Sequence, residues 1–116
     1  MIEFNNTERI VVLFFLYEIM KADTIIHPAE ESYMDKMLKQ FKITTKDIDR
    51  MELLDYSYCE AVLQGFSQEK MAFAKECFVG MSTSDGYVDY REQNLIDRLC
   101  AAKGSTNYGS YRPNGN

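Results

Sequence analysis

The apolar run Ile10-Val-Val-Leu-Phe-Phe-Leu-Tyr17 is the stretch of sequence that decides the fold. A helix with apolar residues on nearly every face has to be surrounded by other elements if the protein is dissolved in water. The run ends at Glu18 and is far shorter than the roughly 20 apolar residues that a membrane-spanning helix needs. We therefore predict a central helix from about Thr7 to Lys21.

Helical spacing of apolar residues continues along the chain, and no segment alternates as a half-buried strand does. Four further helices are predicted over residues 28–40, 44–65, 67–82 and 89–104. In the helix that follows Thr44, the expected buried stripe is Met51, Leu54, Tyr58 and Ala61. The prediction is an all-α protein, a compact bundle of about five helices in one domain over residues 1–102. Residues 103–116 are rich in Gly, Ser and Asn and are expected to form a flexible tail.

Composition excludes several classes of protein. The chain has 116 residues and a net charge of −5, with all 18 acids within residues 1–102, so a nucleic-acid partner is not expected. Three cysteines without a CxxC pair indicate neither a disulfide framework nor a thiolate metal site, and they fit a reducing cytoplasm. No signal peptide or membrane insertion is predicted, which leaves peripheral membrane association open.

The chain also contains an internal repeat. Shifting the sequence by 62 residues aligns residues 10–39 with 72–101, and both segments predict a helix, a loop and a helix. The strict identities are all acidic: Asp23 with Asp85, Glu30 with Glu92, and Asp35 with Asp97. Two such hairpins usually pack about a pseudo-two-fold axis, which would bring the two loops near one another. Asp35 and Asp97 lie about 140° round their helices from the glutamates and are expected to face solvent.

Two interpretations of the loop acids stay open. Each loop resembles the second half of an EF-hand, in which an acid and a final glutamate bind calcium, but neither has the leading carboxylates. Carboxylates from both loops would together suit a shared divalent cation. Alternatively, Glu30, Asp89 and Glu92 only cap the helices that they precede or begin, while Gly86 supplies a positive-φ turn.

The two loop motifs, Ala-Asp-x-x-Ile-x-x-x-Glu over 22–30 and Ser-Asp-Gly-x-Val-x-x-x-Glu over 84–92, resemble the TerB-like superfamily. This superfamily includes tellurite-resistance TerB proteins and the N-terminal domain of a membrane-anchored J-domain co-chaperone. The resemblance covers about residues 8–102. It departs from the family pattern at Thr24, where glycine is favoured, and at His27, where an acid or a small polar residue is usual.

The resemblance implies an all-helical, cytoplasmic, non-enzymatic module of the stress-response type. It also implies a site for a divalent cation, calcium or magnesium. By residue matching the metal ligands would be Asp23, Glu30, Asp85 and Glu92, with Asp89 and Glu31 as neighbours.

The sequence offers few residues that could support catalysis. His27, the only histidine, stands beside a proline at a helix start, and there is no glycine-rich phosphate loop. Two functions remain: a cation-binding stress-response module, and a metal-free adaptor that binds another protein. Tyr56, Tyr87 and Tyr90 are candidate contact residues for such a partner, and the sequence does not define the oligomeric state.

Overall fold

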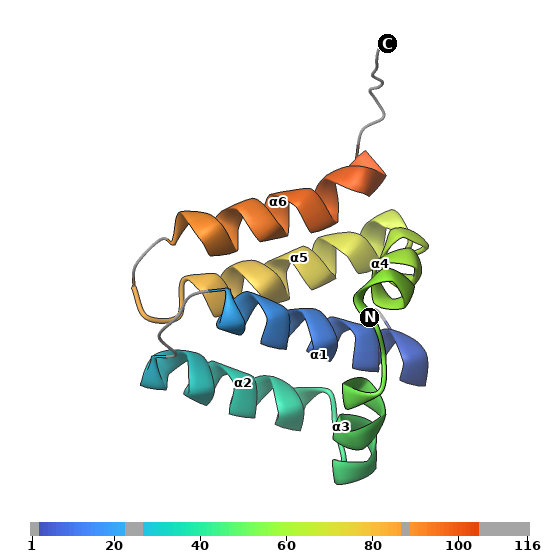
Figure 1. Cartoon of the computed structure of the whole chain (residues 1–116), viewed down its shortest axis with the longest axis horizontal. Helices are drawn as coiled ribbons and strands as arrows, with labels where there is room; N and C mark the ends of the chain where they lie inside the picture. Colours follow the sequence, from blue (N-terminus) through green and yellow to red (C-terminus); the bar gives the residue numbers. More distant parts are fainter. Residues whose placement is uncertain (1–2, 23–26, 87–88, 105–116) are drawn as a thin grey trace.

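The computed structural model describes residues 3–22, 27–86 and 89–104, with side chains described as far as Cys100. The described residues form an all-helical bundle without strands, so the predicted fold class is confirmed (Figure 1). The helices are α1 (Asn6–Lys21), α2 (Pro28–Gln40), α3 (Thr45–Glu52), α4 (Tyr56–Gln64), α5 (Gln68–Ser82) and α6 (Tyr90–Gly104). Within the described ranges, no helix has the length and apolar character needed to cross a membrane.

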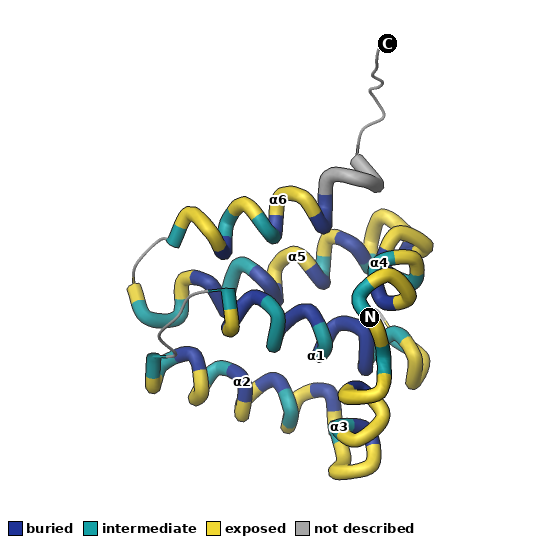
Figure 2. Tube along the Cα trace, viewed as in Figure 1, coloured by how far each residue is buried: buried dark blue, intermediate teal, exposed yellow. Residues whose placement is uncertain are grey.

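The first helix occupies the centre, as its apolar run predicts. α1 packs against each of the other five helices, and most of its residues from Ile10 to Met20 are buried (Figure 2). Its start is fixed by a capping box in which the Asn5 side chain accepts from the backbone N–H of Glu8 and the Glu8 carboxylate accepts from that of Asn5. The second hairpin, α5 and α6, packs along one side of α1, and α2 lies along another (Figure 1).

The prediction of a single helix over residues 44–65 is wrong, because this segment forms two helices. α3 ends at Glu52, and the Asp55 carboxylate then accepts from the backbone N–H of Tyr58 at 2.7 Å, which starts α4. This break turns the chain, so α4 buries Cys59 and Leu63. The predicted stripe therefore fails beyond α3, since Tyr58 and Ala61 are exposed.

A glycine sets the distance between α2 and α5. The hydroxyl of Tyr33 on α2 donates to the carbonyl oxygen of Cys77 on α5 at 3.0 Å. Gly80 lies one turn further along α5, and a Cβ atom there would overlap the Tyr33 hydroxyl and lie 2.7 Å from its ring carbon Cζ. The close approach of these two helices thus requires a residue without a side chain.

Gly80→Ala should therefore destabilise the protein, although glycine to alanine in a helix interior usually stabilises by about 0.5–1 kcal/mol. We expect the free energy of unfolding in urea to fall by about 1–3 kcal/mol, because Tyr33 has to move and its hydrogen bond is lost. In a Tyr33→Ala background the same substitution should instead stabilise. A gain in stability from Gly80→Ala alone would contradict this account of the α2–α5 contact.

Candidate functional site

The two loops that carry the repeated acids lie at the same end of the bundle, where α1 and α5 end and α2 and α6 begin (Figure 1). They are in direct contact, because the Nε2 atom of His27 lies 3.4 Å from the Oδ2 atom of Asp85. The predicted approach of the two loops is thus confirmed. A pseudo-two-fold relation between the hairpins stays a prediction.

The second loop is shaped by a tight turn. Gly86 has φ of +84°, a conformation that side chains disfavour, and its N–H donates to the carbonyl oxygen of Thr83 at 3.0 Å. The predicted positive-φ glycine is confirmed. The turn places Asp85 against the first loop, where its side chain is 16% exposed while that of His27 is 40% exposed.

Two glutamates are buried at equivalent places, each in the first turn of the second helix of its hairpin. Glu30 on α2 is 1% exposed and Glu92 on α6 is 2% exposed. A buried carboxylate is costly without hydrogen bonds, and Glu30 has one, since its Oε1 atom accepts from the backbone N–H of His27 at 3.1 Å. Each carboxylate also lies at the positive end of a helix dipole. The predicted capping role of Glu30 is therefore confirmed, whereas Glu31 beside it is exposed.

Asp89 caps the start of α6. Its Oδ1 atom accepts from the backbone N–H groups of Arg91 at 2.8 Å and Glu92 at 3.4 Å. The side-chain hydrogen bond from Arg91 holds the pKa of Asp89 below its usual value, and these backbone donors act in the same direction. Asp89 thus has the predicted capping role, with its carboxylate turned toward its own helix.

The predicted cation ligands are not assembled as a metal site among the described residues. Asp23 lies outside the described residues. Among those described, no three His, Cys, Asp or Glu side chains converge as a metal site would require. Asp85 instead contacts His27. The sequence did not predict this contact. It identified His27 only as the single histidine of the chain, at a position where the resembled motif has an acid or a small polar residue. The remaining repeated pair, Asp35 and Asp97, is exposed, as expected.

The cysteines are core residues. Cys59, Cys77 and Cys100 are free and buried. Burial, together with neighbouring carboxylates, raises the pKa of Cys59 and of Cys77 to about 11. These groups are therefore neutral thiols near pH 7, a state that neither attacks electrophiles nor binds soft metals well.

The candidate contact tyrosines have different environments. Tyr90 is 80% exposed. Tyr56 is half-buried and packs edge-on against Phe15, with ring centroids 5.4 Å apart, so it belongs to the core boundary. Tyr87 lies outside the described residues. The sequence prediction missed Leu53, which is 87% exposed at the turn between α3 and α4, because it treated that turn as helix.

Comparison of the chain with protein-family models, curated proteins and solved structures found no match.

Glu30 and Glu31 are adjacent acids in the first turn of α2, so a comparison of their variants measures how much capping by Glu30 contributes to stability. Glu30→Ala should lower the free energy of unfolding by about 1–2 kcal/mol, because the buried hydrogen bond to the His27 N–H is lost. Glu31→Ala removes a similarly placed charge from an exposed position and should cost only a few tenths of a kcal/mol. Equal losses in urea unfolding would contradict a specific cap at Glu30.

Proposed function

We propose that this chain is a non-enzymatic, cytoplasmic module of the TerB-like, stress-response type, whose loop end binds a calcium or magnesium ion. The observation that carries the proposal is the contact between the loops of the two hairpins, through His27 and Asp85 at 3.4 Å. Asp23, Glu30, Asp85 and Glu92 are the proposed ligands, and Asp89 is a neighbour. A cation held by both loops would fix the position of one hairpin against the other.

The chemistry of this end of the bundle suits a hard cation. Calcium and magnesium prefer carboxylate oxygens, and Asp85 offers a partly exposed carboxylate at the junction of the loops. The imidazole of His27 already contacts that carboxylate, and a nitrogen ligand suits these ions poorly. Cation binding should therefore displace His27 from Asp85.

A metal-free adaptor that binds another protein is the second candidate. It is favoured by the large apolar side chains that the fold leaves in contact with water, Leu53 at 87% and Tyr90 at 80% exposure. Tyrosine is enriched among the residues that dominate the energy of protein interfaces. In this function His27 and Asp85 hold the two loops together without a cation.

A metal titration separates the two candidates. At ten times its dissociation constant, a cation that binds only the folded chain should stabilise it by about 1.4 kcal/mol and raise the melting temperature by roughly 6–10 °C. Asp85→Asn combined with Glu92→Gln should abolish this rise, and Asp85→Asn alone, which leaves the buried glutamate in place, should reduce it. The matched control is Asp35→Asn with Asp97→Asn, which removes the same charge from exposed sites on α2 and α6 and should leave the rise intact.

The opposite result is equally clear. If neither the melting temperature nor the heat of mixing changes with millimolar calcium, magnesium, manganese or zinc, the cation proposal is wrong and the adaptor function remains. A rise that the control variant abolishes as completely as Asp85→Asn with Glu92→Gln would indicate nonspecific screening of the net charge.

A further inference from the structure

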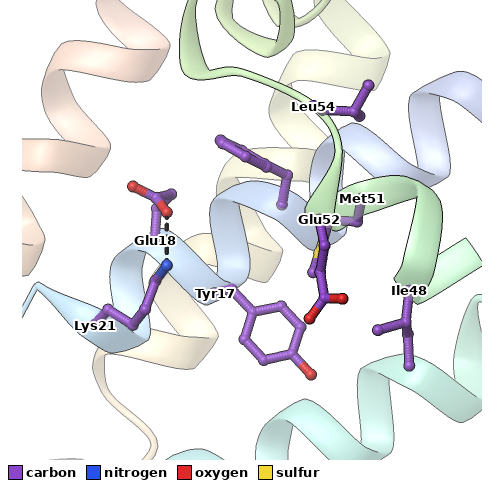
Figure 3. Close-up of a pocket in the computed structure, with 8 residues that line it drawn as sticks. Tyr17, Glu18, Lys21, Ile48, Met51, Glu52 and Leu54 are labelled. Carbon is purple, nitrogen blue, oxygen red and sulfur yellow. Dashed lines mark ion pairs between the residues drawn. The ribbon is translucent and has the colours of Figure 1, made fainter.

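A hollow of about 500 Å³ lies between α1 and α3 (Figure 3). Its apolar lining comes from four side chains, namely Phe14, Ile48, Met51 and Leu54. Glu18 and Glu52 add carboxylates to this lining. The volume falls within the range of roughly 300–1,000 Å³ that is typical of ligand sites, which also combine an apolar lining with a few polar groups.

A second hollow of about 240 Å³ adjoins the first, because Leu54 lines both. The second hollow also contains Ile10, Arg50, Leu53 and Tyr58. Along α1, the residues that line the two hollows recur every three or four positions, apart from the adjacent pair Tyr17 and Glu18. They therefore follow one face of the helix: Thr7, Ile10, Phe14, Tyr17, Glu18 and Lys21. We call the two hollows together the α1–α3 groove, and it follows about 20 Å of α1.

Charge is distributed unevenly along this groove. At the end near the C-terminus of α1, Glu18 is held 3.1 Å from Lys21 by an ion pair (Figure 3). Glu52 projects into the same hollow near the Tyr17 ring, and among the described residues it forms no ion pair (Figure 3). Burial, and then the charges of Asp35 and Glu52, raise the pKa of Tyr17, which indicates negative potential around its hydroxyl. The other end of the groove carries Arg50.

The shape and the charge together define a partner. We propose that the α1–α3 groove binds an amphipathic helix of another protein, with leucine-like residues on Leu53, Leu54 and Phe14 and an arginine or lysine against Glu18 and Glu52. A groove along one helix face fits a helix whose apolar residues recur every three or four positions. A second copy of this chain is disfavoured, because each copy carries a net charge of −5 and two copies therefore repel one another.

The partner's basic residue has a defined role. Its aliphatic stem would cover Met51 and Ile48 while its charged end reaches the carboxylates, an arrangement that suits long basic side chains. The inference rests on the protein-binding candidate function and does not require a cation, because the residues that line the groove include none of the proposed metal ligands.

A designed peptide tests the groove directly. The probe is a synthetic helical peptide of leucine and alanine with two arginines at one end of its apolar face, titrated into the full ¹⁵N-labelled chain by NMR. The largest amide shifts should fall in residues 7–21 and 48–58. Glu18→Gln with Glu52→Gln should weaken binding about three- to tenfold, as expected for two partly exposed ion pairs. Leu53→Glu, at a position outside the core, should weaken it further.

Three controls test whether charge contributes to peptide binding. Glu69→Gln with Glu76→Gln removes the same charge from exposed positions on α5 and should leave the affinity within twofold. A peptide with citrulline in place of arginine should bind three- to tenfold more weakly to the unaltered chain and lose nothing more on Glu18→Gln with Glu52→Gln. Raising the salt concentration should weaken only the arginine peptide.

Several results would overturn the proposal. Three of them are equal affinity for the arginine and citrulline peptides, an equal loss in the α5 control variant, and no peptide binding at millimolar concentration. Shifts that cluster outside the groove would also overturn it while leaving the adaptor function standing, and self-association that buries the groove would replace the partner helix by a second copy. None of these results depends on the metal titration, so the two proposals fail separately.

Discussion

The constraint on which the structure depends is the burial of α1. Its residues from Ile10 to Leu16 leave no polar face, so neighbours have to cover the helix on every side, and all five other helices contact it. α2, α5 and α6 are 13 to 15 residues long and run along α1, whereas α3 and α4 have only eight and nine residues. Two short helices cover their side incompletely, which is why the α1–α3 groove lies there, with Phe14 and Tyr17 only half-buried.

The same constraint brings the two acidic loops together. Because both hairpins pack their first helices against one another and turn at the same end, the start of α2 lies close to the turn that follows α5, where His27 contacts Asp85 (Figure 1). Helix starts present unpaired N–H groups and the positive end of the helix dipole. Acids at these positions are therefore stabilised by the helix itself, without any bound ligand. Glu30 and Asp89 have this capping role, and His27 then joins the first loop to Asp85 of the second.

Much of the fold could be predicted from the sequence, because the apolar run of α1, Pro28 and Ser67 are local signals that agree with the packing. The break between α3 and α4 could not. Apolar spacing continues through Met51, Leu54 and Tyr58 without a glycine or proline, and the signal that ends the helix is a single Asp55 acting as a cap. Lys42 likewise ends α2 at φ of +57° without the usual glycine. For the candidate site, loop proximity and capping could be predicted, whereas the His27–Asp85 contact depends on how the hairpins pack.

Capping and cation binding are compatible at this end of the bundle. A carboxylate has about four lone-pair positions, and the His27 N–H takes one of those on Glu30. The cap holds the carboxylate in one orientation at a buried position, which reduces the entropy that a cation would have to overcome on binding. Asp89 is different, because its two oxygens face the backbone of its own helix and the Arg91 guanidinium. A cation shared by both loops would therefore have to bring Asp85 and the two buried glutamates together, since no three such side chains converge among the described residues, and it would have to replace the His27–Asp85 contact.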